Sequence, residues 1–177
     1  MRTKTTSTKS TPMQNNHTRI LAFDPGFERL GVAVVEKRAG KEILLYSACI
    51  RTSATLPFTE RLGQLGAATE ALFAQWSPHA VALEDIYFAK NAKTAIKVAE
   101  VRGMLGYIAT QHKLPVFNYT PLQVKVAITG YGQSDKHAVS AMVGRLVTLP
   151  VQKRLDDELD AIAVGLTCLA FERTWSK

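Results

Sequence analysis

The chain has 177 residues, of which 46% are hydrophobic and 21% charged, and its formal net charge is +7. Such values are typical of one soluble globular domain with a sizeable core. No apolar run is long enough to span a membrane, and the start of the chain lacks the apolar segment of a secretory signal. Cys49 and Cys168 lie in apolar segments, which favours reduced thiols in a cytoplasmic protein. The excess positive charge favours a polyanionic partner such as nucleic acid.

The first third of the chain predicts a tail followed by a β-meander. Residues 1–17 are polar, contain three basic residues and no acidic one, and predict a disordered basic tail. Three β-rich runs follow at 20–24, 31–37 and 43–50, separated by short turn-prone segments. We therefore expect these three strands to pair in an antiparallel arrangement.

The rest of the chain alternates between helical and strand patterns. Asn91 and Ser134 are candidate N-caps, and Thr120 begins a capping box followed by proline. The expected elements are a helix between Pro57 and Pro78, a strand at 79–84, a helix at 91–111, a strand at 115–119, a helix from 121 to Gly130, a helix after Ser134 and a helix at about 155–171.

This order predicts the α/β class, with a mixed sheet of about five strands, the first three antiparallel, flanked by α-helices. The folded domain is expected to cover residues 18–172, and residues 173–177 to form a C-terminal tail.

Acidic residues lie where these elements end or begin. Asp24 ends the first strand, and Glu84 ends the fourth. On the last helix, Asp157 and Asp160 share a face at i, i+3, but Asp156 and Asp160 share one at i, i+4, so spacing does not choose between Asp156 and Asp157. Carboxylates without His or Cys suit hard cations such as Mg²⁺ or Mn²⁺, and two such ions can hydrolyse a phosphodiester.

Five motifs occur in a fixed order: Ile-Leu-Ala-Phe-Asp-Pro-Gly at 20–26, Leu-Glu-Asp-Ile-Tyr-Phe-Ala-Lys-Asn at 83–91, Ala-Glu-Val-Arg-Gly at 99–103, a basic segment at 123–136, and Asp-x-x-Asp-Ala-Ile-Ala at 157–163. Together they resemble the RuvC family of Holliday junction resolvases from about residue 18 to 170. The resemblance implies an RNase H-like fold, a homodimer and Mg²⁺-dependent cleavage of four-way DNA junctions. It also implies a RuvA–RuvB branch-migration complex as a partner.

The resemblance assigns the catalytic and metal-binding roles to Asp24, Glu84, Asp157 and Asp160, and so selects Asp157 over Asp156. We expect two Mg²⁺ ions per site, with Mn²⁺ able to substitute. Cleavage would produce paired nicks with 5′-phosphate and 3′-hydroxyl ends.

Five further residues are expected to bind DNA. Lys90 and Lys93 begin a basic stripe beside the Glu84 motif, and Lys125 and Lys136 match basic positions of the family. Tyr87 follows Glu84 closely, where an aromatic ring could stack on unpaired bases.

The sequence leaves two alternative functions open and argues against a third, an actin-like ATPase, whose required features are absent. A RuvC-like nuclease could act on RNA, or a junction-binding module could lack catalysis. An actin-like ATPase would need a second phosphate motif and a larger chain.

Overall fold

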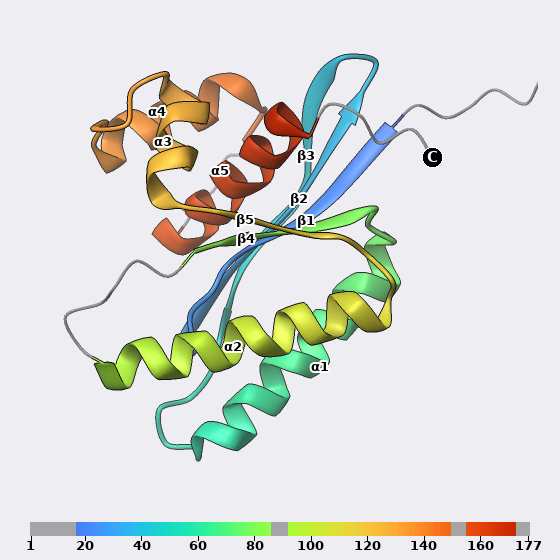
Figure 1. Cartoon of the computed structure of the whole chain (residues 1–177), viewed down its shortest axis with the longest axis vertical. Coiled ribbons are helices and arrows are strands. Elements are labelled where there is room, and N and C mark those ends of the chain that lie inside the picture. The colour runs from blue at the N-terminus through green and yellow to red at the C-terminus, as the bar shows by residue number, and fades with distance from the viewer. Residues whose placement is uncertain (1–16, 86–91, 150–154, 173–177) are drawn as a thin grey trace, which may run out of the picture.

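The computed structural model describes residues 17–85, 92–149 and 155–172. In chain order (Figure 1) the elements are β1 (His17–Asp24), β2 (Arg29–Arg38), β3 (Lys41–Arg51), α1 (Phe58–Trp76), β4 (Ala80–Glu84), α2 (Ala92–Gln111), β5 (Val116–Tyr119), α3 (Pro121–Thr129), α4 (Lys136–Leu146) and α5 (Asp156–Phe171). The predicted order of strands and helices is confirmed.

The strands form one five-stranded sheet in the order β3-β2-β1-β4-β5. β1 pairs antiparallel with β2, and β2 with β3, whereas β4 runs parallel to β1 and β5 parallel to β4. The predicted α/β class, with a mixed sheet whose first three strands are antiparallel, is confirmed. Because β1 is the central strand, its last residue lies in the middle of the row of strand ends on one side of the sheet.

Helices cover both faces of the sheet, so alternate residues of β1 enter two separate cores (Figure 1). Ile20 and Ala22 pack with α3, α4 and α5, whereas Leu21 and Phe23 pack with α1 and α2. All four side chains are fully buried. In the described part of the chain no helix is long and apolar enough to cross a membrane.

Two details differ from the sequence prediction. β1 begins at His17, one residue before the expected start of the domain. The N-cap of α4 is Asp135 rather than Ser134, and its carboxylate accepts a hydrogen bond from the Ala138 N–H at 2.8 Å. Ser134 is engaged elsewhere, because its hydroxyl lies 2.7 Å from Thr129 Oγ1.

The capping box at the start of α3 is confirmed. Asn91, the expected N-cap of the preceding long helix, lies outside the described residues.

Candidate active site

Two of the predicted acids lie side by side at one edge of the sheet. Phe23 and Leu83 are partners in the parallel ladder between β1 and β4, and Asp24 and Glu84 are the next residue of each strand. Because parallel strands end at the same edge, their carboxyl ends bring these two side chains together. A side-chain hydrogen bond joins Asp24 and Glu84.

The N-terminal turn of α5 carries the other acids to the same place. Its backbone touches the sheet at Gly31, the β2 partner of Asp24. A Cβ atom at position 31 would lie 1.9 Å from the Asp157 carbonyl oxygen and 3.1 Å from Asp24 Cβ. Only glycine therefore allows α5 to approach closely enough to place Asp157 beside Asp24.

The pKa of Asp24 shows that it lies close to the other acids. Burial, the charges of Glu84 and Asp160, the hydrogen bond with Glu84 and the charge of Asp157 together raise the pKa of Asp24 to about 8. Burial also raises the pKa of Glu84, despite the hydrogen bond from Asp24. At neutral pH and without a cation, the Asp24–Glu84 pair therefore holds a proton, which a bound cation would release.

Basic side chains lie beside three of the acids on α5. Lys136 Nζ, in the first turn of α4, lies 3.0 Å from Asp160 Oδ2 and 3.4 Å from Asp156 Oδ2. Arg29 Nε, at the start of β2, lies 3.3 Å from Asp157 Oδ2. That oxygen is buried in the described structure. Although it lies near Arg29, it accepts no hydrogen bond. Asp157 therefore has a carboxylate oxygen available for another ligand.

This donor set fits a hard cation such as Mg²⁺. It consists of carboxylate oxygens alone, it is largely buried, and it includes the oxygen of Asp157 without a hydrogen bond. Within residues 17–85, 92–149 and 155–172, however, no three Asp, Glu, His or Cys side chains already converge on one ion position. For the acids to share an ion, the side chains would have to move closer together and the Asp24–Glu84 pair would have to release its proton.

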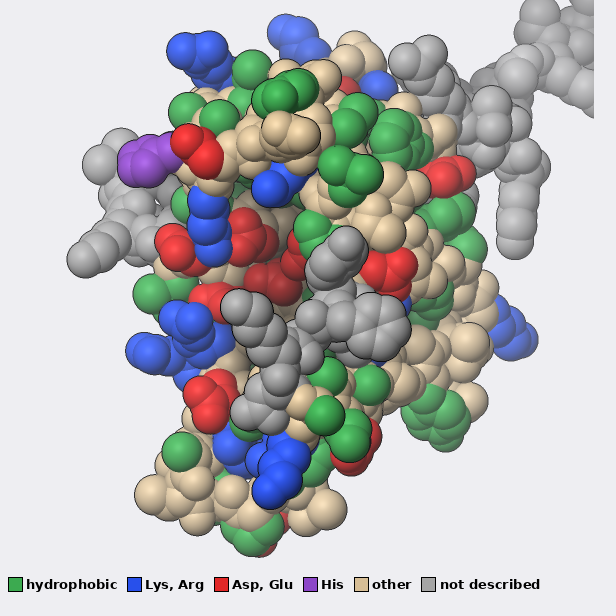
Figure 2. All heavy atoms as spheres, turned by 60° about the vertical axis from the view of Figure 1, so that its left-hand side comes forward, with side chains coloured by type: hydrophobic (Ala, Val, Ile, Leu, Met, Phe, Trp, Pro, Cys, Tyr) green, Lys and Arg blue, Asp and Glu red, His purple; other side chains and the backbone are tan. Residues whose placement is uncertain are grey.

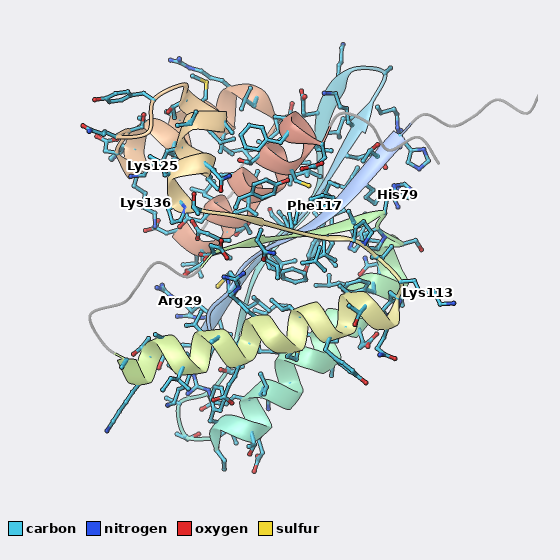
Figure 3. The ribbon with its side chains drawn as sticks, viewed as in Figure 1. Arg29, His79, Lys113, Phe117, Lys125 and Lys136 are labelled. Atoms are coloured by element: carbon cyan, nitrogen blue, oxygen red, sulfur yellow. The ribbon has the colours of Figure 1, made fainter. Side chains whose placement is uncertain are left out.

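A cavity of about 240 Å³ opens beside the acids. In Figure 2, acidic side chains gather in a hollow of this face, with basic side chains around it. Figure 3 shows Lys125, Lys136 and Arg29 around the same end of the molecule, whereas Lys113 lies at the other end. The lining residues are Glu84, Pro121, Val124, Lys125, Lys136, Val139, Asp160 and Ala163.

Of the other predicted DNA-binding residues, only Lys93 lies in the described part of the chain. Lys93 is exposed in the first turn of α2. Tyr87 and Lys90 lie outside the described residues.

Sequence reasoning missed two arginines at this site. Arg29 has no motif of its own, and only the docking of α5 on β2 places it beside Asp157. Arg102 on α2 lies 2.6 Å from Asp85 Oδ1 and donates a hydrogen bond to Asn118 Oδ1 at 2.7 Å. It thereby ties α2 to the residues beside Glu84. Its place in the motif at 99–103 was the signal that could have marked it.

The sheet order and the two helical layers define an RNase H-like domain with a carboxylate cluster at the carboxyl ends of β1 and β4. Residues 20–168 match the family model described as "Crossover junction endodeoxyribonuclease RuvC". The chain belongs to the RuvC family.

Relatives and solved structures agree with this assignment. Proteins of the same description are 41% identical in Desulfitobacterium hafniense, over 83% of this chain and 89% of the relative, and 42% identical in Thermosipho melanesiensis, over 87% and 98%. The structure of Thermus thermophilus RuvC in complex with a Holliday junction substrate superposes with a TM-score of 0.83 at 33% identity, covering 88% of this chain and 95% of that one. The yeast mitochondrial Holliday junction resolvase Ydc2, at 13% identity and a TM-score of 0.69, shares the fold.

Proposed function

We propose that this protein is a crossover junction endodeoxyribonuclease, which resolves four-way (Holliday) DNA junctions by paired symmetric nicks in DNA recombination and repair. The observation that carries the proposal is the buried carboxylate cluster around Asp24 in a RuvC-family domain. Burying like charges together opposes folding, and such strongly perturbed acids mark functional sites. Similarity to a RuvC that is bound to a Holliday junction supports the choice of substrate.

Asp24, Glu84, Asp157 and Asp160 would hold two Mg²⁺ ions, with Mn²⁺ as a substitute. Asp24 is the central ligand, since its pKa responds to all three other acids. When bound, the ions would supply an activated water and stabilise the leaving 3′ oxygen. Cleavage would then produce 5′-phosphate and 3′-hydroxyl ends.

The basic residues bind and orient the DNA backbone. Lys136 is half-exposed in the first turn of α4, so it can exchange Asp160 for a phosphate oxygen, and that exchange frees the carboxylate. Lys125 lines the same cavity and binds a neighbouring phosphate. Lys93 extends this surface along α2. Tyr87 and Lys90 keep their predicted roles in stacking and phosphate binding.

We further propose a homodimer, because two symmetry-related sites are needed for paired nicks. The exposed side of α2 is the candidate interface: Ile96 and Tyr107 are 60% and 63% exposed. Among the described residues, nothing lies within 4 Å of where a Cβ would stand at Gly103 or Gly106. Packing within one chain therefore does not explain these two glycines.

Sedimentation velocity tests the interface. Tyr107→Asp should shift the protein from dimer to monomer, because it would bury a charge at the contact. Tyr131→Asp is the matched control, since Tyr131 is 61% exposed but lies between α3 and α4 on the other face of the sheet. A dimer that survives the Tyr107 change would contradict this assignment.

The substrate is tested with a synthetic mobile four-way junction, a linear duplex and a single-stranded flap, each with Mg²⁺. Wild-type protein should place paired nicks in the junction alone, and Asp24→Asn should place none. Junction binding without cleavage in both Mg²⁺ and Mn²⁺ would favour the non-catalytic binding module. Absence of any junction preference would favour the RNA-directed nuclease, to be tested next on structured RNA.

Because Cys49 and Cys168 are free thiols, we place the protein in the cytoplasm. A RuvA–RuvB complex would present the junction to it.

A further inference from the structure

A buried acid in the first turn of α5 has no part in the proposed metal set. Glu158 lies between Asp157 and Asp160 in the chain and is only 6% exposed. Asp156 and Asp157 already complement the helix dipole in this turn, so the dipole does not require a third acid. Burial of a charged side chain is costly unless it is hydrogen-bonded, and its place therefore needs a structural reason.

The edge strand β3 holds this acid. Ser47 Oγ donates a hydrogen bond to Glu158 Oε1 at 2.6 Å, which joins positions 111 residues apart in the chain. Ser47 pairs with Ala33 in the β2–β3 ladder, two residues beyond Gly31. The hydrogen bond and the Gly31 contact are thus neighbouring attachment points of the same helical turn on the sheet.

The first turn of α5 has two attachments to the sheet, one on each side. Contact at Gly31 holds its backbone against β2, and the buried residues of α5, with a second close contact at Gly165, hold the rest of the helix. Successive helical side chains point about 100° apart, since a turn holds about 3.6 residues. Asp157 faces Arg29, Glu158 faces Ser47 and Asp160 faces Lys136, so the hydrogen bond on the β3 side holds the turn that carries both neighbouring acids.

We propose that Glu158 and Ser47 are positioning residues: their hydrogen bond holds the first turn of α5 to β3 and so orients the carboxylates of Asp157 and Asp160 for metal binding. Neither residue touches the metal or the DNA. The inference rests on the proposed function in one respect, namely that these two acids are metal ligands.

The test measures Mn²⁺ binding by calorimetry on the full chain without DNA. Ser47→Ala and Glu158→Ala should raise the apparent Kd by about 10-fold, at the lower end of what the loss of a residue orienting a ligand costs. Ser47→Thr keeps the donor and Glu158→Gln keeps the acceptor, so both should bind close to the wild-type value. Circular dichroism checks that each variant is folded, and Ser47→Val, which has the shape of the threonine variant without its donor, replaces Ser47→Ala if the latter does not fold.

A second readout separates positioning from general stability. Excess Mn²⁺ should restore junction cleavage by Glu158→Ala, with wild-type junction affinity throughout. Unchanged Mn²⁺ binding in both alanine variants would overturn the inference, and so would a Glu158→Gln variant as weak as Glu158→Ala, because charge rather than the hydrogen bond would then matter. Failure of the wild-type protein to bind Mn²⁺ would instead overturn the metal assignment itself.

Discussion

Paired strands β1 and β2 carry a buried carboxylate near each end, and the two are treated in opposite ways. At one end, Asp24 is surrounded by other acids, and its pKa is raised to about 8. At the other end, Glu36 is fully buried opposite Arg19. Its Oε2 accepts hydrogen bonds from Arg19 Nε at 2.9 Å and Nη2 at 2.8 Å, and its Oε1 accepts one from Arg38 Nε at 2.9 Å.

The difference separates an end that serves stability from the end at which we propose the metal site. Burial acts to raise the pKa of Glu36, but the hydrogen bonds from Arg19 and Arg38 outweigh it and lower the pKa below its ordinary value. Glu36 therefore contributes to stability in its charged form. Asp24 gains no such stabilisation from its neighbours, and a cluster that lowers stability in this way supports the metal site that we propose there.

The largest expected effect separates activity from stability at the Asp24 end. Asp24→Asn should reduce junction cleavage by about 10³-fold or more, because a central ligand is lost. It should leave the metal-free protein as stable as the wild type or more stable, because a buried carboxylate among like charges disappears. Gel assays of junction nicking and thermal unfolding without metal check the two parts. Marked destabilisation would contradict the functional reading of this end.

Glu36→Gln should have the reverse profile. It leaves Arg19 only partly satisfied, so the free energy of unfolding should fall by about 2 kcal/mol, less than for a fully buried pair because Arg38 is 61% exposed. Cleavage should be unchanged at temperatures well below unfolding. Urea denaturation gives the stability. Arg38→Gln is the milder control, since Arg19 continues to bind Glu36.

A smaller effect is expected among the lysines. Lys125→Gln should weaken junction binding by about 1 kcal/mol and reduce the salt dependence by about one ion, because one phosphate contact is lost. Lys113→Gln removes the same charge at the opposite end of the molecule (Figure 3) and should leave both quantities unchanged. Fluorescence anisotropy at several salt concentrations measures them. Equal losses in the two variants would indicate only a general charge effect.

In the metal-free wild type, the effect of pH on stability should change direction, because the two ends titrate in different pH ranges. Asp24 has a folded pKa above its unfolded value of 3.8, so its contribution to stability is lost as pH rises toward about 8. Glu36 has a folded pKa below its unfolded value of 4.5, so its contribution is present above that value and is lost as pH falls through the folded pKa.

Single variants should reveal the two dependences. Metal-free Glu36→Gln should lose stability as pH rises from about 4 to about 8. Asp24→Asn should lose stability mainly in acid and less as pH rises, where burial of Glu84 still raises its pKa. Thermal unfolding across this pH range distinguishes them. Identical pH profiles for the two variants would show that neither carboxylate is linked to folding in this way.

Most of the fold could be predicted from sequence because its signals are local. Apolar periodicity identified every strand and helix in order, and Thr120 with Pro121 marked the start of α3 correctly. The N-cap of α4 was wrong, since Ser134 and Asp135 are equally good caps in isolation. A contact with Thr129 decided between them.

At the site, strand ends and helix spacing were sufficient to select Asp24, Glu84 and the acids of the last helix. They could not distinguish Asp156 from Asp157, and resemblance to a known family made that choice. Tertiary packing alone placed the Asp157 backbone on Gly31, Arg29 beside Asp157 and Ser47 against Glu158. These contacts join segments about 110 to 130 residues apart, and no local pattern encodes a distance that exists only after the helix has docked on the sheet.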